Sequence, residues 1–131
     1  MSKTLTEYEN WVTAKMSPAS MESFNTKIAT GGLGLGGEGG ECADIAKKVL
    51  FHGMEFTDEV RQKLVKELGD ALFYIAFTAR NVCGVGIQDI LDANVEKLDA
   101  RYKEGFTVEE FMAKEKAKEG ELPLSPYREL D

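Results

Sequence analysis

Two carboxylate pairs with the same spacing are the residues of this chain best suited to chemistry. Glu38 and Glu41 lie three residues apart, and so do Glu67 and Asp70. On a helix, residues three apart are neighbours on one face, where like charges destabilise each other. Neither Glu38 nor Glu41 has a Lys or Arg three or four residues away. A metal ion is therefore the simplest source of the missing positive charge.

The available ligands favour a hard cation. Four carboxylates without clustered His or Cys suit Mg²⁺, with Mn²⁺ as a substitute. His52 is the only histidine and is not three residues after a glutamate, which argues against a di-iron helical bundle. Surface ion pairs remain an alternative for the second pair, because Lys63 and Lys66 precede Glu67 and Asp70 by four residues. Taken alone, either pair is more often a solvated face, but both together favour a metal site.

Composition limits the class of protein. With 131 residues, we expect a single domain over residues 1–131. A hydrophobic content of 43% excludes a disordered chain, and no apolar run approaches the ~20 residues of a membrane span. The net charge of −7 argues against binding nucleic acid through a broad basic surface. The N-terminus is too polar for a signal peptide, so we expect a cytoplasmic protein.

Hydrophobic periodicity predicts an all-α fold, a bundle of four to five helices. Seven of the ten residues from 31 to 40 are glycine, which favours a loop over residues 31–37. The segment 106–131 is expected to hold a short helix and an extended tail. The first expected helix covers residues 4–16, and a second starts at Ser17-Pro18. Further helices are expected at 38–50, at 58–82, at 87–104 and, as a short one, near 108–118. The helix at 58–82 is expected to be an inner helix, packed on more than one side.

Helical phase predicts where the acids point. Glu38 falls on the same side as Cys42 and Ile45, and Glu41 falls at the edge of that side, so both acids are expected to face inward. Tyr74 lies one turn beyond Asp70 and could stack on a base or ribose, although a single aromatic is more often part of a core.

The helix expected at 87–104 carries a polar stripe. Asn94, Lys97 and Arg101 share one side at offsets of three and four residues. An amide and two cations could bind phosphate oxygens. If the carboxylate pairs were absent, Lys97 and Arg101 would be explained about equally well as ordinary solvated surface residues.

These motifs together resemble the MazG-like family of all-α nucleoside triphosphate pyrophosphohydrolases. The resemblance lies in E-x-x-E, in E-x-x-D within KELGDALFYIA, and in N-x-x-K-x-x-x-R-Y from Asn94 to Tyr102, followed by Gly105-Phe106. It covers roughly residues 5–106. The chain departs from the family pattern at Gly39-Gly40, where family members usually have a better helix former.

The resemblance implies Mg²⁺-dependent hydrolysis of a (deoxy)nucleoside triphosphate between its α and β phosphates. Either Glu38 or Glu41 would activate the attacking water. The resemblance also implies a homodimer or homotetramer with sites shared between chains. By motif, the metal ligands would be Glu38, Glu41, Glu67 and Asp70, and the substrate contacts would be Asn94, Lys97, Arg101, Tyr74 and Tyr102.

Two other functions stay open at this point. One is phosphoribosyl-ATP pyrophosphohydrolase, a related all-α activity. The other is a non-catalytic helical dimerisation module whose acids are surface charges. Residues 17–30, which carry no clear motif, are candidates for setting the base and sugar preference.

Overall fold

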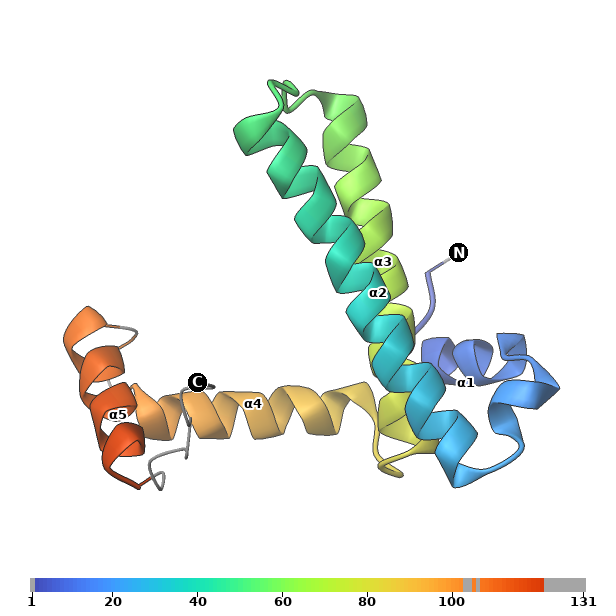
Figure 1. Cartoon of the computed structure of the whole chain (residues 1–131). Coiled ribbons are helices and arrows are strands. Elements are labelled where there is room, and N and C mark those ends of the chain that lie inside the picture. Colours follow the sequence, from blue (N-terminus) through green and yellow to red (C-terminus); the bar gives the residue numbers. More distant parts are fainter. Residues whose placement is uncertain (1, 103–104, 106, 122–131) are drawn as a thin grey trace, which may run out of the picture. The chain divides into compact units, whose positions relative to one another are not determined.

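The computed structural model describes residues 2–102, 105 and 107–121, without the side chains of 119–121. This part of the chain forms five α-helices and one 3-10 helix and no strand, which confirms the all-α prediction (Figure 1). Two compact units divide between Leu91 and Asp92, and each is described by itself. The single-domain prediction stays a prediction. The helices are α1 (Leu5–Lys15), η1 (Pro18–Met21), α2 (Phe24–Phe51), α3 (Asp58–Asn81), α4 (Ile87–Arg101) and α5 (Val108–Glu121).

Side-chain caps fix the starts of α1 and α3. The Thr4 hydroxyl accepts a hydrogen bond from the backbone N–H of Glu7, with an N–O distance of 3.2 Å. The Thr57 hydroxyl accepts one from the backbone N–H of Val60 at 3.3 Å. Each hydroxyl satisfies a donor that the first helical turn leaves without a partner. The predicted starts of both helices are confirmed.

The segment between α1 and α2 differs from the prediction. Ser17 caps only the short 3-10 helix η1, and α2 starts afresh at Phe24. A capping box marks that start, because the Ser23 hydroxyl accepts from Thr26 N–H at 3.1 Å while the Thr26 hydroxyl accepts from Ser23 N–H at 3.0 Å. These reciprocal bonds define the entry to α2.

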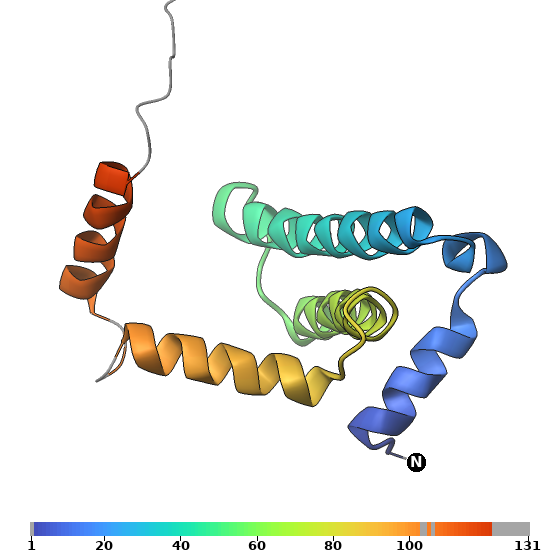
Figure 2. The ribbon, with the colours of Figure 1, turned by 90° about the horizontal axis from the view of Figure 1, so that it is seen from below.

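The loop predicted over residues 31–37 is wrong, because α2 is continuous from Phe24 to Phe51. Two of its glycines, Gly31 and Gly34, permit close packing of α2 along α3, and both views show the two helices side by side (Figures 1 and 2). A Cβ added at Gly31 would lie 2.1 Å from Thr78 Oγ1, and one at Gly34 would lie 2.3 Å from the Tyr74 ring. Tertiary packing therefore outweighs the low helix propensity of glycine.

The first unit has a small core where α1 crosses α3. Val12, Ala76 and Phe77 are fully buried there. Helix α3 packs against both α1 and α2, as expected of an inner helix. Its remaining surface is less enclosed than predicted, since Val65 and Leu68 are both more than half exposed.

The turn after α3 positions the start of α4. Gly84 has a φ of +69°, a left-handed conformation that suits glycine. The backbone N–H of Ile87 donates to Oε1 of Glu9, a buried residue of α1, at 2.7 Å. The Asp89 carboxylate accepts from Gly86 N–H at 2.9 Å. Two carboxylates thus satisfy the N–H group of Ile87, the first residue of α4, and that of Gly86 just before it.

Within the second unit, α5 forms where a short helix was expected. The Thr107 hydroxyl caps it by accepting from Glu110 N–H at 3.1 Å. The helix extends to Glu121, three residues beyond the predicted end. The extended tail was predicted over residues 120–131; residues 120 and 121 belong to α5, and the rest of the tail lies outside the described residues.

Candidate functional site

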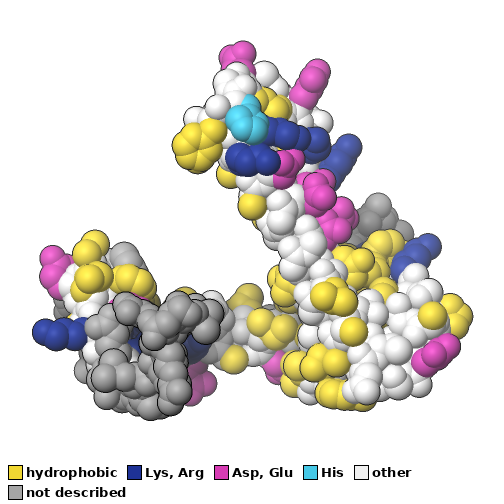
Figure 3. All heavy atoms as spheres, in the orientation of Figure 1, with side chains coloured by type: hydrophobic (Ala, Val, Ile, Leu, Met, Phe, Trp, Pro, Cys, Tyr) yellow, Lys and Arg dark blue, Asp and Glu magenta, His cyan; other side chains and the backbone are white. Residues whose placement is uncertain are grey.

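Three of the four predicted acids meet between α2 and α3. Glu38 comes from α2, and Glu67 and Asp70 come from α3. One carboxylate oxygen from each lies within 4.8 Å of the other two. Glu38 and Glu67 are half-buried, and Asp70 is exposed. Acidic side chains gather along this helix pair in Figure 3. We call these three residues the acidic cluster.

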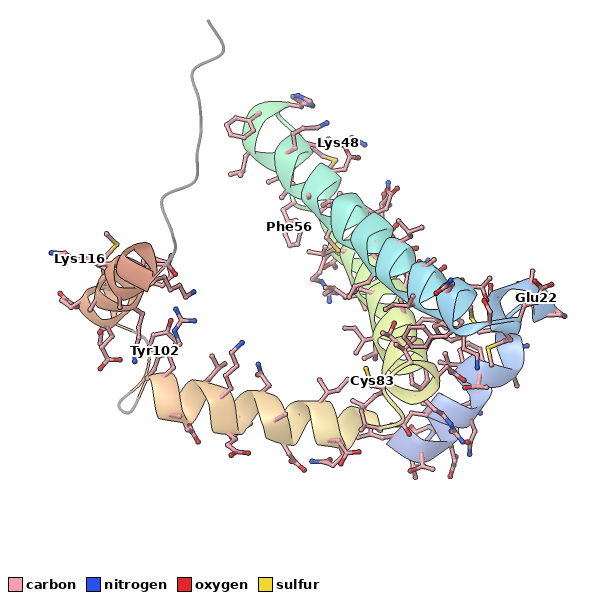
Figure 4. The ribbon with its side chains drawn as sticks, turned by 60° about the horizontal axis from the view of Figure 1, so that its bottom comes forward. Glu22, Lys48, Phe56, Cys83, Tyr102 and Lys116 are labelled. Atoms are coloured by element: carbon pink, nitrogen blue, oxygen red, sulfur yellow. The ribbon has the colours of Figure 1, made fainter. Side chains whose placement is uncertain are left out.

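Within residues 2–102, no lysine or arginine forms an ion pair with a residue of the acidic cluster. Lys63 and Lys66 form no ion pair there, so the surface-pair alternative for Glu67 and Asp70 is not realised. On α2, Lys47 and Lys48 instead bind Asp44 at 3.2 and 2.7 Å. Figure 4 shows Lys48 near one end of the helix pair and Cys83 at the other.

The pKa of Glu38 is raised above its ordinary value of 4.5. Loss of water around the carboxyl group is the largest cause, followed by a side-chain hydrogen bond with Glu67. The negative charges of Asp70, Glu67 and Glu41 add to the shift. The cluster therefore favours a bound proton or cation at Glu38.

Glu41 lies outside the acidic cluster. It is exposed, so the expectation that both acids of the first pair face inward holds for Glu38 and is wrong for Glu41. Its charge still acts on the Glu38 carboxyl, and it is the smallest contributor to the raised pKa of Lys48, after the hydrogen bond and charge of Asp44. Its predicted role as a metal ligand stays a prediction.

The acidic cluster fits one small divalent cation. Ligands on opposite sides of Mg²⁺ are ~4.2 Å apart, because each Mg–O bond is ~2.1 Å. The 4.8 Å limit on the separations of the three carboxylate oxygens is compatible with that span after small side-chain adjustments. An all-oxygen ligand set suits Mg²⁺ or Mn²⁺ rather than zinc.

A pocket of about 430 Å³ lies beside the acidic cluster. Tyr74 lines it, close to where it packs over Gly34 of α2. Helix α1 also reaches this region, because Trp11 and Lys15 line the pocket. The pKa of Tyr8, on the same helix, is raised first by burial and then by the charge of Asp70. The described residues that line the pocket are Trp11, Lys15, Glu38, Asp70, Phe73 and Tyr74.

Sequence reasoning missed the contribution of α1 to this pocket. Trp11 and Lys15 were not among the predicted site residues. The spacing of Tyr8, Trp11 and Lys15, at offsets of three and four, would have placed an aromatic pair and a cation along one stripe of the helix. That signal does not say which other helix the stripe faces.

The predicted phosphate contacts lie in the second unit. Asn94 and Lys97 are exposed on α4. Arg101 is half-buried, lies 3.7 Å from the carboxylate of Glu115, and sits over the Tyr102 ring at 5.3 Å from its centroid. Their contact with a substrate stays a prediction.

Comparison with known proteins gives one family and one relative. The model of the MazG nucleotide pyrophosphohydrolase domain matches residues 29–106, a range that includes both carboxylate pairs. The "Gene 37 protein" of Mycobacterium phage L5 is 39% identical over 75 residues, which are 56% of this chain and 64% of that protein. The match thus spans less than two thirds of the relative's length. No solved structure matches significantly. None of the described helices is long and apolar enough to cross a membrane.

Proposed function

Because the chain belongs to the MazG nucleotide pyrophosphohydrolase domain family, we propose that it hydrolyses a nucleoside or deoxynucleoside triphosphate between the α and β phosphates. The products are a nucleoside monophosphate and pyrophosphate. The acidic cluster of Glu38, Glu67 and Asp70 is the observation that carries this proposal, because triphosphate hydrolysis needs positive charge beside the phosphates.

Glu38, Glu67 and Asp70 hold the divalent cation, Mg²⁺ or Mn²⁺. A bound cation supplies positive charge for the triphosphate and lowers the pKa of water. Glu41 lies one helical turn from Glu38, is exposed, and is not part of the acidic cluster. Its carboxylate is therefore free of the cluster's hydrogen bonds and accepts the proton of the water that attacks the α-phosphorus in line.

The remaining predicted residues bind the substrate. Lys97 and Arg101 place cationic donors on the phosphates, and Asn94 adds an amide donor. Tyr74 contacts the nucleoside, which is supported by its position in the pocket that also contains Glu38 and Asp70. Tyr102, whose ring lies beneath the Arg101 guanidinium, keeps that side chain in place.

The chain assembles with further copies of itself into a homodimer or homotetramer. The support is the large apolar surface of α2 and α3: Leu50 is 71% exposed, Phe51 is 78% exposed and Val65 is 56% exposed. Large apolar side chains that stay exposed on two packed helices favour association with another chain. Light scattering after gel filtration measures the mass, and a monomer at micromolar concentration would contradict this assembly.

Pyrophosphate release across the common NTPs and dNTPs, with Mg²⁺ and with Mn²⁺, tests the activity. Glu38→Gln is expected to lower kcat/KM by about 100-fold or more, because even partners outside the ligand shell cost 10–100-fold when replaced. Glu22→Gln is the matched control, since this exposed glutamate lies at the end of η1, before the start of α2 (Figure 4), and is not part of the acidic cluster. It should keep wild-type activity.

Three outcomes would contradict the proposal. Full activity in Glu38→Gln would remove the acidic cluster from the mechanism. Preferential turnover of phosphoribosyl-ATP would assign the related pyrophosphohydrolase activity instead. The absence of both hydrolysis and a Mg²⁺-dependent rise in melting temperature would leave a non-catalytic helical module.

A further inference from the structure

The pocket beside the acidic cluster combines metal-binding acids with an aromatic wall. Its volume is about 430 Å³, within the range of small-molecule sites. Glu38 and Asp70 belong to both the pocket and the cluster. The rest of its described lining is Trp11, Lys15, Phe73 and Tyr74. A molecule whose phosphates lie at the acids therefore has its next group against the aromatic rings.

The Trp11 ring is held in place but not covered. It stacks on Tyr8 with a centroid separation of 5.8 Å and an interplanar angle of 24°. It meets the edge of Phe73 at 6.1 Å and 90°, and Phe73 meets Tyr74 at 5.4 Å and 80°. Trp11 nevertheless stays 39% exposed, whereas its neighbour Val12 is fully buried in the core. A pre-oriented and partly open indole loses little entropy when a flat ligand stacks on it.

Lys15 gives this pocket a single cationic donor among its described lining residues. Its ammonium lies 5.8 Å from the centroid of the Trp11 ring. The residue is exposed, so the side chain is free to move aside and meet the edge of a stacked ring. An ammonium donates hydrogen bonds and accepts none. It therefore favours a ring with a carbonyl oxygen at its edge over one with an amino group there.

A neighbouring hollow of about 440 Å³ shares Trp11 but not the acids. It is lined by Lys3, Thr4, Leu5, Tyr8, Trp11 and Leu72, with no carboxylate among its described lining residues. A nucleotide bound through a cation at the acidic cluster would lie next to the 430 Å³ pocket, because Glu38 and Asp70 line that pocket. The shared carboxylates thus select which hollow takes the base.

We propose that α1 supplies the base-binding wall of the nucleotide site, with Trp11 stacking on the base and Lys15 donating a hydrogen bond to a carbonyl oxygen of that base. This inference rests on the proposed triphosphate hydrolysis. It assigns the substrate to the triphosphates of oxo-bearing bases, such as guanine, hypoxanthine, uracil and thymine, in preference to adenine. It also places the specificity determinants in α1 rather than in residues 17–30.

The wild-type protein offers a direct binding test, because Trp11 is the only tryptophan in the chain. The probe is guanosine 5′-(α,β-methylene)triphosphate with Mg²⁺, which cannot be cleaved between the α and β phosphates. Stacking should quench the indole fluorescence in a saturable manner. Inorganic triphosphate with Mg²⁺, which lacks a base, should leave it unchanged. Absence of quenching in a protein that hydrolyses GTP would overturn the stacking role.

Two variants of Trp11 test the same contact by kinetics. Trp11→Leu should raise KM about tenfold, in line with the ~1–3 kcal/mol that aromatic stacking contributes per base, while kcat changes by less than about twofold. Trp11→Phe keeps a ring and should restore most of the affinity. An unchanged KM in folded Trp11→Leu would overturn the proposal. Fluorescence of the wild type decides the question if Trp11→Leu does not fold.

The pair ITP and ATP tests Lys15, because hypoxanthine and adenine differ at position 6, where one has a carbonyl oxygen and the other an amino group. The wild type should prefer ITP in kcat/KM, and Lys15→Gln should reduce that preference by about tenfold. Lys47→Gln removes the same charge from an exposed site on α2 and should leave the preference unchanged. An equal loss for both nucleotides in Lys15→Gln would mean a phosphate contact and would overturn the base assignment.

These results separate the inference from the function beneath it. If no nucleotide is hydrolysed with any divalent cation, the proposed function fails. If hydrolysis depends on Glu38 but neither the fluorescence nor the ITP preference responds as described, only the base-binding role of α1 fails.

Discussion

The packing of α2 on α3 through Gly31 can be tested by a pair of adjacent substitutions. A Cβ at Gly31 would lie 2.1 Å from Thr78 Oγ1 and 3.1 Å from Thr78 Cβ. Rotation of the threonine side chain cannot relieve both contacts, because its Cβ does not move. At Gly32 an added Cβ would have nothing within 4 Å. The two positions thus differ in packing while sharing the same helix.

The expected magnitudes follow from that difference. Replacing glycine by alanine inside a helix gains ~1 kcal/mol of helix propensity at either position. Gly32→Ala should therefore raise the free energy of unfolding by about 0.5–1 kcal/mol. Gly31→Ala adds the cost of overpacking, ~1–3 kcal/mol. Because the propensity gain is common to both, Gly31→Ala should be about 1–3 kcal/mol less stable than Gly32→Ala.

Urea unfolding followed by circular dichroism, at one fixed protein concentration, measures this difference. The double variant Gly31→Ala/Thr78→Ala removes the threonine hydroxyl and methyl groups and should recover much of the loss as a coupling energy. Equal stabilisation by Gly31→Ala and Gly32→Ala would refute close packing at Gly31. It would also remove the explanation given for the helical conformation of the glycine-rich stretch.

Three further predictions concern other parts of the first unit. Because the pKa of Glu38 is raised in the fold, protonation of this residue stabilises the metal-free protein at pH values below its ordinary pKa of 4.5. That stabilisation is lost as the pH rises through the raised pKa. The gain in melting temperature from Mg²⁺ should therefore grow with pH, and Glu38→Gln should abolish that growth. Glu9→Ala leaves the N–H of Ile87 without its carboxylate and should cost ~1.5–3 kcal/mol in urea unfolding, with little loss in Glu9→Gln. Thr57→Ala should cost ~1 kcal/mol, whereas Thr57→Ser should not, because serine keeps the hydroxyl that caps Val60.

Local signals in the sequence were sufficient for most helix boundaries. The starts predicted near residues 4, 58 and 108 agree with those of α1, α3 and α5, because the Thr4, Thr57 and Thr107 caps depend only on the first helical turn. The predicted end of α3 at residue 82 lies close to the observed end at Asn81, just before Gly84, whose left-handed conformation suits glycine whatever lies around it. The all-α class follows from the same periodicity.

The glycine-rich stretch could not be predicted in this way. Helix propensity favours a loop there, and it would be decisive in an isolated peptide. The helix forms because Gly31 and Gly34 let Thr78 and Tyr74 of α3 approach the backbone of α2. These contacts join residues at least 40 positions apart, and no local pattern contains them.

The sequence alone was enough to predict a site for a hard divalent cation, because it contains two carboxylate pairs, the first without a Lys or Arg three or four residues away. Which acids meet depends on the packing of α2 against α3. The tertiary structure grouped Glu38 with Glu67 and Asp70, left Glu41 exposed, and brought Trp11 beside them. The physical reason is that spacing along one helix fixes which side chains share a face. Packing between helices decides which faces oppose each other and at what distance.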